Sequence, residues 1–164
     1  MLRRLVVDIS GVSRLERPDG PLAGPLAGPA RVVDGDTIIV AGERVRLHGI
    51  DAPELDQPFW WRGQQLDCGT IALAALEALT AGVPLRCEPV ERDCYGRLVA
   101  KCFSPNGCDV GHRLVLAGWA LAYRRYSLDY VDAENEARKA ERGMWRGSFM
   151  KPWVWRASRM PRRS

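Results

Sequence analysis

The stretch of residues 31–54, RVVDGDTIIVAGERVRLHGIDAPE, decides the fold of this chain. It contains a β-branched run at 37–40 and a run of alternating polarity at 43–47, and Ala41 and Gly42 separate the two runs. Such runs favour strands, and a short glycine-containing connection between them favours antiparallel pairing. The sequence therefore predicts a β-hairpin with an acidic turn on either side of it.

The predicted hairpin brings charged side chains together at its open end. Asp36 precedes the first strand and Asp51 follows the second, so antiparallel pairing places these two carboxylates close to each other. Carboxylates and turn carbonyls are the ligands that a hard cation such as Ca²⁺ prefers. Glu54 and Arg46 belong to the same segment. This combination favours phosphodiester chemistry over a purely structural core.

Three motifs in order resemble the staphylococcal nuclease family. They are DGDT at 34–37, RLHGIDAPE at 46–54 and DCYGR at 93–97, and their separations also fit that family. The resemblance extends over residues 30–145 and implies a β-rich α+β fold, a five-stranded OB-like Greek-key barrel with three helices. Periodicity alone supports only a small mixed β/α domain.

The resemblance also implies a cation site. Asp36, Asp51 and the backbone carbonyl of Ala52 match the positions that bind Ca²⁺ in the family. The family's better-known member has threonine where this chain has Ala52, and a carbonyl ligand survives that exchange. Asp34 would position these ligands without binding the cation itself, and its carboxylate can also cap the DGDT turn.

Five further residues match positions that handle the substrate. Arg46 and Arg97 match the two phosphate-binding arginines, whose guanidinium groups suit bidentate contacts with phosphate oxygens. Glu54 matches the residue that serves as general base or orients the attacking water. Tyr95 and Tyr123 match positions that line the nucleotide pocket.

Alternative roles remain for some of these positions. Arg46 could be an outward-facing strand residue paired with Glu43 or Glu54, and Tyr123 could simply pack in the core. The chain also departs from the better-known member at Cys94, which replaces lysine, and at Arg125, which replaces tyrosine. Both departures concern the grip on substrate rather than the catalytic set.

The resemblance therefore implies a Ca²⁺-dependent nuclease that cleaves DNA and RNA through attack of water at phosphorus. Its expected partners are single-stranded or frayed DNA and RNA, and it is expected to be a monomer. The first alternative is a non-catalytic nucleic-acid-binding module, against which the joint retention of the acids and arginines argues. The second is an accessory protein of an exopolysaccharide pathway, because some similar bacterial proteins with a Pro-Trp-x-Trp-Arg tail carry such labels.

The composition is that of one globular domain. The chain has 164 residues with 46% hydrophobic and 27% charged residues, and its net charge of +4 permits a polyanionic partner. No apolar run approaches the roughly 18 residues that span a bilayer. Residues 1–7 begin like a signal peptide, but Asp8 interrupts the apolar run. We therefore expect a cytoplasmic protein, or a secreted one if the start lies elsewhere.

Three regions are expected. Residues 1–29 would form an N-terminal extension whose Pro/Gly-rich part, which repeats PLAG, cannot continue a helix or a strand ladder. Residues 30–147 would form the nuclease-like domain. Residues 148–164 form a basic tail rich in Trp and Arg. Either this tail grips a polyanion, or Pro152, Trp153 and Trp155 fold back onto the domain.

The remaining elements follow from local patterns. We expect a loop at 55–62, strands at 85–90, 97–103 and 119–123, and helices at 63–80, 110–117 and 130–142. Asp109 and Asp129 are the predicted N-caps of the last two helices. The five cysteines include no C-x-x-C pair, which argues against zinc. Free thiols are favoured, with one or two disulfides as the alternative for an exported protein.

Overall fold

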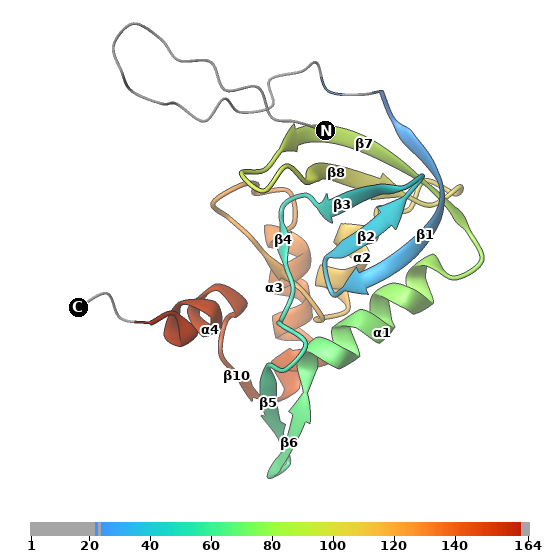
Figure 1. The fold of residues 1–164 in the computed structure, drawn as a ribbon. Helices are drawn as coiled ribbons and strands as arrows, with labels where there is room; N and C mark the ends of the chain where they lie inside the picture. Colours follow the sequence, from blue (N-terminus) through green and yellow to red (C-terminus); the bar gives the residue numbers. More distant parts are fainter. Residues whose placement is uncertain (1–21, 23, 162–164) are drawn as a thin grey trace, which may run out of the picture.

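A closed barrel of five strands forms the centre of the computed structural model, which describes residue 22 and residues 24–161 (Figure 1). Neighbouring strands pair antiparallel, except for the third and fourth in the barrel order, which pair parallel. This architecture confirms the predicted five-stranded barrel of the β-rich α+β class. In barrel order the strands are β1 (Leu26–Asp34), β2 (Thr37–Val40), β3 (Glu43–Leu47), β8 (Leu98–Phe103) and β7 (Pro84–Arg92).

The predicted hairpin is confirmed in β2 and β3. Thr37 pairs with Arg46 and Val40 pairs with Glu43, and the turn between the strands has positive φ angles at both central residues, 50° at Ala41 and 78° at Gly42. These angles give the turn a twist that matches the twist of the strands. The alternation places apolar side chains inside the barrel, including Ile38, Val40, Val45 and Leu47.

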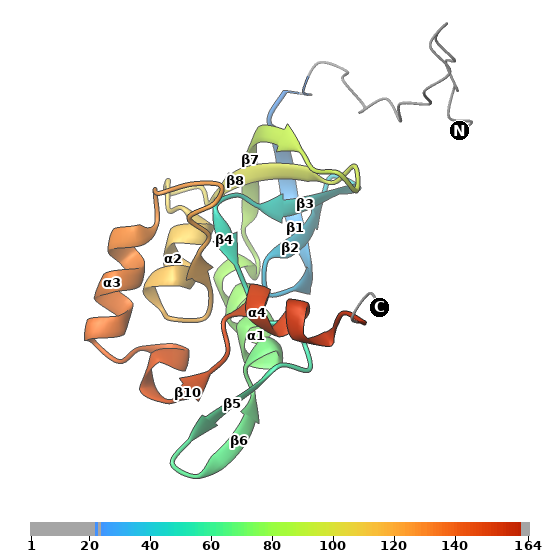
Figure 2. The same cartoon turned by 90° about the vertical axis from the view of Figure 1, so that its left-hand side faces the viewer.

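Helices cover one end and one side of this barrel. In place of the three predicted helices, the described residues form four α-helices and one 3₁₀ helix. The first helix packs against β1, the second against the first and against β8, and the third against the second (Figure 2). These elements are α1 (Cys68–Thr80), α2 (Val110–Leu116), α3 (Val131–Lys139), η1 (Gly143–Arg146) and α4 (Pro152–Arg159).

The segment that joins the hairpin to α1 differs from the prediction. We expected a loop and then a helix from residue 63, but β5 (Pro58–Trp61) and β6 (Gln64–Asp67) form a second hairpin, and β10 (Ser148–Phe149) pairs with β5. The turn residue Arg62 has a φ of 51°, which no local signal indicated. Burial of Phe59 in a second apolar cluster with Cys68, Leu121 and Met144 stabilises this arrangement.

The prediction that the Pro/Gly-rich segment cannot join a ladder is wrong for its last residues. Leu26 pairs with Cys87, and Pro29 stands opposite Pro84 in the last pair of this ladder. Leu26 also packs against the main core, so that burial offsets the weak strand preference of the segment. Residues 1–21 lie outside the described part of the chain, and with them most of the predicted extension.

One of the two predicted helix caps is confirmed. The Asp109 carboxylate accepts a hydrogen bond from the backbone N–H of His112 (3.1 Å) at the start of α2. Asp129 does not cap α3, because the helix begins one residue later than expected and the Asp129 carboxylate binds Lys101 (2.6 Å). Every helix in the described part of the chain is either too short or too polar to cross a lipid bilayer.

The favoured assignment of five free thiols is wrong for one pair. Cys87 and Cys102 stand directly opposite each other on β7 and β8 and form a disulfide, whereas Cys68, Cys94 and Cys108 are free. Both bonded cysteines are buried in the barrel core. Their pairing depends on the register of two strands, which the spacing of cysteines in the sequence does not reveal.

Candidate active site

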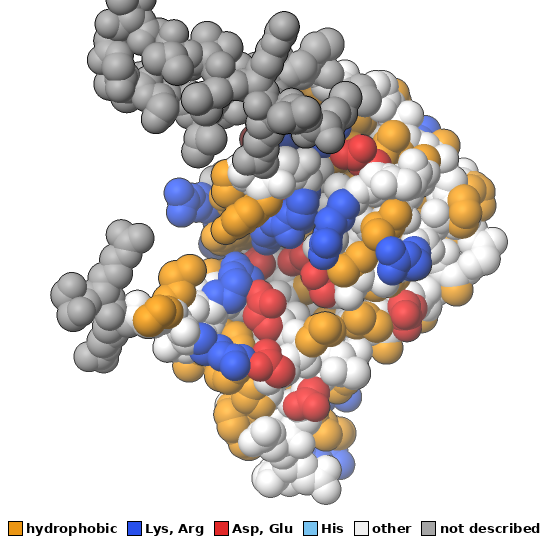
Figure 3. Space-filling model, viewed as in Figure 1, with side chains coloured by type: hydrophobic (Ala, Val, Ile, Leu, Met, Phe, Trp, Pro, Cys, Tyr) orange, Lys and Arg blue, Asp and Glu red, His pale blue; other side chains and the backbone are white. Residues whose placement is uncertain are grey.

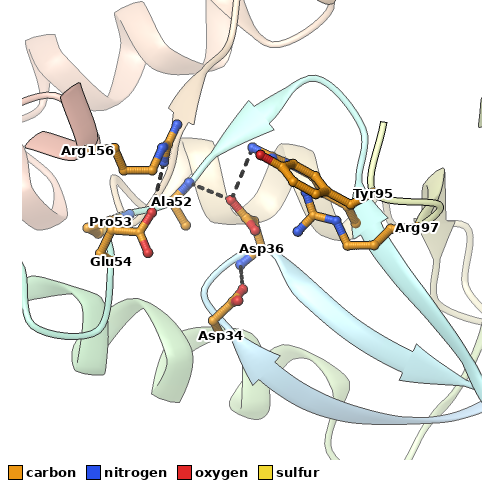
Figure 4. A pocket seen from close by; sticks show the side chains of 9 residues that line it. Asp34, Asp36, Ala52, Pro53, Glu54, Tyr95, Arg97 and Arg156 are labelled. Carbon is orange, nitrogen blue, oxygen red and sulfur yellow. Dashed lines mark hydrogen bonds and ion pairs between the residues drawn. The ribbon is translucent and has the colours of Figure 1, made fainter. Parts of the chain in front are cut away.

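A pocket of about 220 Å³ opens at the end of the barrel where the two acidic turns meet (Figure 4). Its walls come from four separate parts of the chain: the β1–β2 turn, the end of β3 with the segment after β4 (Ile50–Asp51), the β7–β8 turn, and α4. Carboxylates and guanidinium groups dominate its lining. The lining residues are Asp34, Asp36, Arg46, Ala52, Pro53, Glu54, Tyr95, Arg97 and Arg156.

Asp36 joins the two acidic turns. Its Oδ2 accepts a hydrogen bond from the backbone N–H of Ala52 (3.0 Å), and its backbone N–H donates to Asp34 Oδ1 (3.1 Å). The turns approach so closely that a Cβ on Gly35 would lie 2.7 Å from the Cβ of Ala52, which requires glycine there. Burial and the charge of Asp36 raise the pKa of Asp34. The hydrogen bond from the Asp36 backbone to the Asp34 carboxylate confirms the predicted turn-capping role of Asp34.

Arg46 points into the site instead of outward. Its Nη2 lies 3.1 Å from Asp51 Oδ1 and 3.8 Å from Asp36 Oδ2, so that one guanidinium group bridges the two predicted cation ligands. Glu43, the alternative partner, is occupied by Arg92 (2.7 Å). The expectation that pairing of β2 and β3 brings Asp36 and Asp51 together is thereby confirmed.

Asp51 contacts Arg46 and Arg156 of the pocket lining and is itself completely buried. Arg156 binds it through both guanidinium nitrogens, with Nη1 3.0 Å from Oδ1 and Nη2 2.8 Å from Oδ2. Loss of contact with water raises the pKa of Asp51 from 3.8 to about 6, although the hydrogen bonds from Arg156 oppose this change. The site therefore holds one acid that is unusually easy to protonate.

We expect the carboxyl group of Asp51 to titrate with a midpoint near pH 6. Because its pKa is higher in the folded than in the unfolded protein, the folded state binds the proton more tightly, and the contribution of this group to stability falls as the pH rises from about 4 to about 6. Carbon NMR of the aspartate side chains measures the midpoint, with Asp51→Asn to assign the signal. A midpoint near 4 would contradict the burial argument.

Glu54 is positioned by its backbone as well as by its carboxylate. Its Oε1 accepts a hydrogen bond from Arg156 Nη1 (3.0 Å), and its backbone N–H donates to the fully buried side chain of Gln57 (3.3 Å). The start of α1 touches its carbonyl, since a Cβ on Gly69 would lie 1.8 Å from that oxygen. Packing of α1 thus determines where Glu54 stands.

The DCYGR turn places Tyr95 and Arg97 on the opposite wall of the pocket (Figure 4). Asp93 organises this turn, because its Oδ1 accepts from the backbone N–H groups of Tyr95 (2.9 Å) and Arg97 (3.0 Å) and its Oδ2 accepts from Arg97 Nε (2.7 Å). Tyr95 is 81% exposed, and the centroid of its ring lies 5.5 Å from the Arg97 guanidinium carbon.

Tyr123, the other predicted nucleotide-binding residue, does not line this pocket. It stacks on Trp153 of α4, with ring centroids 5.4 Å apart and planes 16° from parallel. The structure thus favours the packing role for Tyr123 and brings the other predicted residues together at one site. Their roles in chemistry stay predictions.

Arg156 is the site residue that the sequence interpretation missed. It belongs to α4 in the tail, where Pro152 is buried and Trp153 covers Tyr123, so this part of the tail folds back onto the domain. The spacing of Trp153 and Arg156 places both on one side of a helix, and this pattern was the available signal. Residues 162–164 lie outside the described part of the chain.

The donor types suit Ca²⁺, but in the observed arrangement Arg156 occupies one of these donors, Asp51. Asp36, Asp51 and Glu54 supply only oxygen atoms, as a hard cation requires. However, both oxygens of Asp51 are hydrogen-bonded to Arg156. Within residues 24–161, no three His, Cys, Asp or Glu side chains form a group that could hold a metal ion. The guanidinium group of Arg156 takes up the carboxylate that the cation would need.

Comparison with known proteins agrees with this geometry. The family model described as "Staphylococcal nuclease homologue" matches residues 44–147, which include Arg46, Asp51, Glu54 and Arg97. The chain belongs to this family. The DGDT turn and α4 of this staphylococcal nuclease homologue lie outside the matched residues.

Three relatives illustrate the range of names within the family. The chain is 42% identical to the succinoglycan biosynthesis protein ExoI of Rhizobium meliloti (strain 1021) over 135 residues, 78% of this chain and 69% of the relative. It is 37% identical to an uncharacterized endonuclease of Escherichia coli over 133 residues, 77% of this chain and 81% of the relative. It is 33% identical to the micrococcal nuclease of Shigella flexneri over 143 residues, 77% of each chain.

Proposed function

We propose that this chain is a nuclease that hydrolyses phosphodiester bonds of DNA and RNA by attack of water at phosphorus. The observation that carries this proposal is the pocket in which Arg46, Arg97 and Glu54 converge. A phosphodiester resists hydrolysis because an anion must be attacked by water. A catalyst must therefore neutralise the charge of the transition state, activate the water and align the reacting groups.

The two arginines are suited to the first task. Arg46 lines the pocket and contacts Asp51, and Arg97 lines it from the β7–β8 turn. The contact between Arg97 and Asp93 uses Nε, so the two terminal nitrogens of Arg97 remain for phosphate oxygens. Guanidinium groups stay protonated and bind phosphate oxygens in pairs, so these arginines stabilise the added negative charge of the transition state.

Glu54 and Tyr95 complete the proposed site. The Glu54 carboxylate lines the pocket and accepts or directs a proton of the attacking water. The exposed ring of Tyr95 offers a flat surface on which a base can stack, and a single strand exposes its bases for that contact. The pocket walls thus favour single-stranded or frayed nucleic acid as substrate.

Ca²⁺ dependence is the finer part of the proposal. The oxygen-only donors Asp36, Asp51 and Glu54 support it, and the contacts of Arg156 with Asp51 oppose it in the arrangement described above. Asp36, Asp51 and Glu54 would hold such a cation, which would supply Lewis-acid stabilisation of the phosphate and help activate the attacking water. One relative is named a succinoglycan biosynthesis protein, but the charged lining of this pocket supports a phosphodiester substrate.

The test is digestion of end-labelled single-stranded DNA, duplex DNA and RNA by the purified chain. Each substrate is incubated with Ca²⁺, with Mg²⁺ and with a chelator, and the Glu54→Gln variant, purified in parallel, excludes a contaminating nuclease. We expect cleavage in Ca²⁺, fastest on single strands, and little cleavage in chelator. Binding without cleavage under all conditions would identify a non-catalytic binding module. Equal cleavage in chelator would support the nuclease function and contradict the calcium requirement.

A further inference from the structure

Helix α4 carries an arginine from the tail into the acidic centre of the site. Figure 2 shows α4 crossing in front of α1, close to β4, and Figure 3 shows basic and acidic side chains next to one another on the face where α4 meets the domain. Arg156 is the residue that enters, and its partners Asp51 and Glu54 lie 105 and 102 positions earlier in the chain.

Several contacts hold α4 in this place. Trp153 stacks on Tyr123, and the buried side chain of Gln57 donates a hydrogen bond to the carbonyl of Met150 (2.5 Å) just before the helix. At the far end Arg159 forms an ion pair with Asp56. These contacts involve residues on both sides of Arg156, so its position follows from the docking of a whole element and not from one flexible side chain.

The burial of Asp51 explains why its carboxylate needs a positively charged partner. A fully buried carboxylate without a partner is costly, because it has lost its hydration and gained nothing in exchange. Arg46 supplies one hydrogen bond to Asp51, and Arg156 supplies two. Arg156 is therefore the principal counter-ion of Asp51 in this arrangement.

The guanidinium group of Arg156 and a divalent cation compete for the same carboxylate oxygens of Asp51. Arg156 donates to both oxygens of Asp51 and also to Glu54, so these lone pairs are directed at the guanidinium group. A dication brought to Asp51 would have to replace those hydrogen bonds, and it would be repelled by the positive charge of Arg156 at close range. Occupation of Asp51 by Arg156 and by a dication therefore exclude each other.

We propose that Arg156 is a built-in competitor of the divalent cation at Asp51, and that α4 must withdraw this side chain before a cation can bind. This inference takes its cation from the proposed function and adds a residue that determines the cation affinity. Docked α4 stabilises the cation-free protein, so a higher cation concentration is needed to occupy the site. The same withdrawal uncovers Glu54, so cation binding and release of this carboxylate are coupled.

The first test measures Ca²⁺ binding by calorimetry, without substrate, in wild type, Arg156→Gln and the control Arg159→Gln. Glutamine removes the charge, so we expect Arg156→Gln to bind Ca²⁺ about tenfold more tightly than wild type, the effect of losing competing hydrogen bonds to a charged group. Arg159 belongs to the same helix, but its ion pair with Asp56 is exposed and therefore contributes little to docking, so Arg159→Gln should bind nearly like wild type. Equal or weaker binding by Arg156→Gln would overturn the proposal.

The second test uses wild type alone and does not depend on the folding of a variant. Hydrogen exchange of the amides in residues 153–159 is compared without Ca²⁺ and with saturating Ca²⁺, and we expect faster exchange with the ion because α4 is released. Unchanged or slower exchange would contradict the proposal, as would a failure of both wild type and Arg156→Gln to bind Ca²⁺. Cleavage in chelator alongside such a failure would leave the nuclease function standing.

Discussion

Replacing Glu54 by glutamine is expected to slow cleavage of single-stranded DNA by about 10²–10⁴-fold, the range that positioned general bases contribute. Glutamine has nearly the same shape as glutamate, and its side-chain oxygen can still accept the hydrogen bond from Arg156 that the carboxylate accepts in the structure. It has no negative charge, however, and cannot take a proton from water. The variant therefore changes the chemistry of the site and preserves its form.

Single-turnover cleavage of a labelled oligonucleotide measures this effect, and binding of the same oligonucleotide without turnover serves as a check. The matched control is Glu43→Gln, since Glu43 pairs with Arg92 and does not line the pocket. We expect the control to cleave like wild type. If Glu54→Gln also cleaves at the wild-type rate, Glu54 takes no part in proton transfer or in orienting water.

Replacing Arg46 by alanine is expected to lower kcat/KM by about 10²–10³-fold, the loss seen when one stabilising donor is removed from a transition state. Arg46 lines the pocket and also binds Asp51, so the variant loses a phosphate contact and one counter-ion of a buried acid. We therefore expect a lower free energy of unfolding as well, by about 1–3 kcal/mol. Kinetics and urea unfolding measure these two effects separately.

Arg44→Ala is the matched control for Arg46→Ala. Both residues belong to β3, but they are two positions apart, and Arg44 is exposed and does not line the pocket. The control should leave kcat/KM close to wild type and reveal any general effect of removing positive charge. A similar loss of activity in both variants would assign Arg46 to nonspecific attraction of the polyanion and not to the site.

The local patterns of the sequence predicted the centre of this structure correctly. The β-branched and alternating runs around Gly42 predicted the β2–β3 hairpin, and Asp109 predicted the start of α2. The approach of Asp36 and Asp51 followed from that hairpin alone, because antiparallel strands return to where they began. These features depend on neighbours in the chain, and such preferences are visible in sequence.

The errors arose where distant contacts override local preference. Leu26 joins a strand within a Pro/Gly-rich segment because it packs, partly buried, against the barrel core, and Phe59 belongs to a hairpin because a second cluster buries it. Asp129 caps nothing because Lys101 of β8 binds its carboxylate. In each case the deciding partner lies far away in the sequence, and no window of neighbouring residues contains it.

The sequence by itself determined which reactive groups are available, since the three acids and two arginines to which we assign phosphodiester chemistry all lie in its three motifs. Only the tertiary structure decided which positively charged side chain from the tail binds Asp51. Arg156 reaches that carboxylate from 105 positions away, because Pro152 and Trp153 bury apolar surface against the domain and thereby place the helix that carries it. The free energy of that docking belongs to the whole fold, and local sequence preferences do not express it.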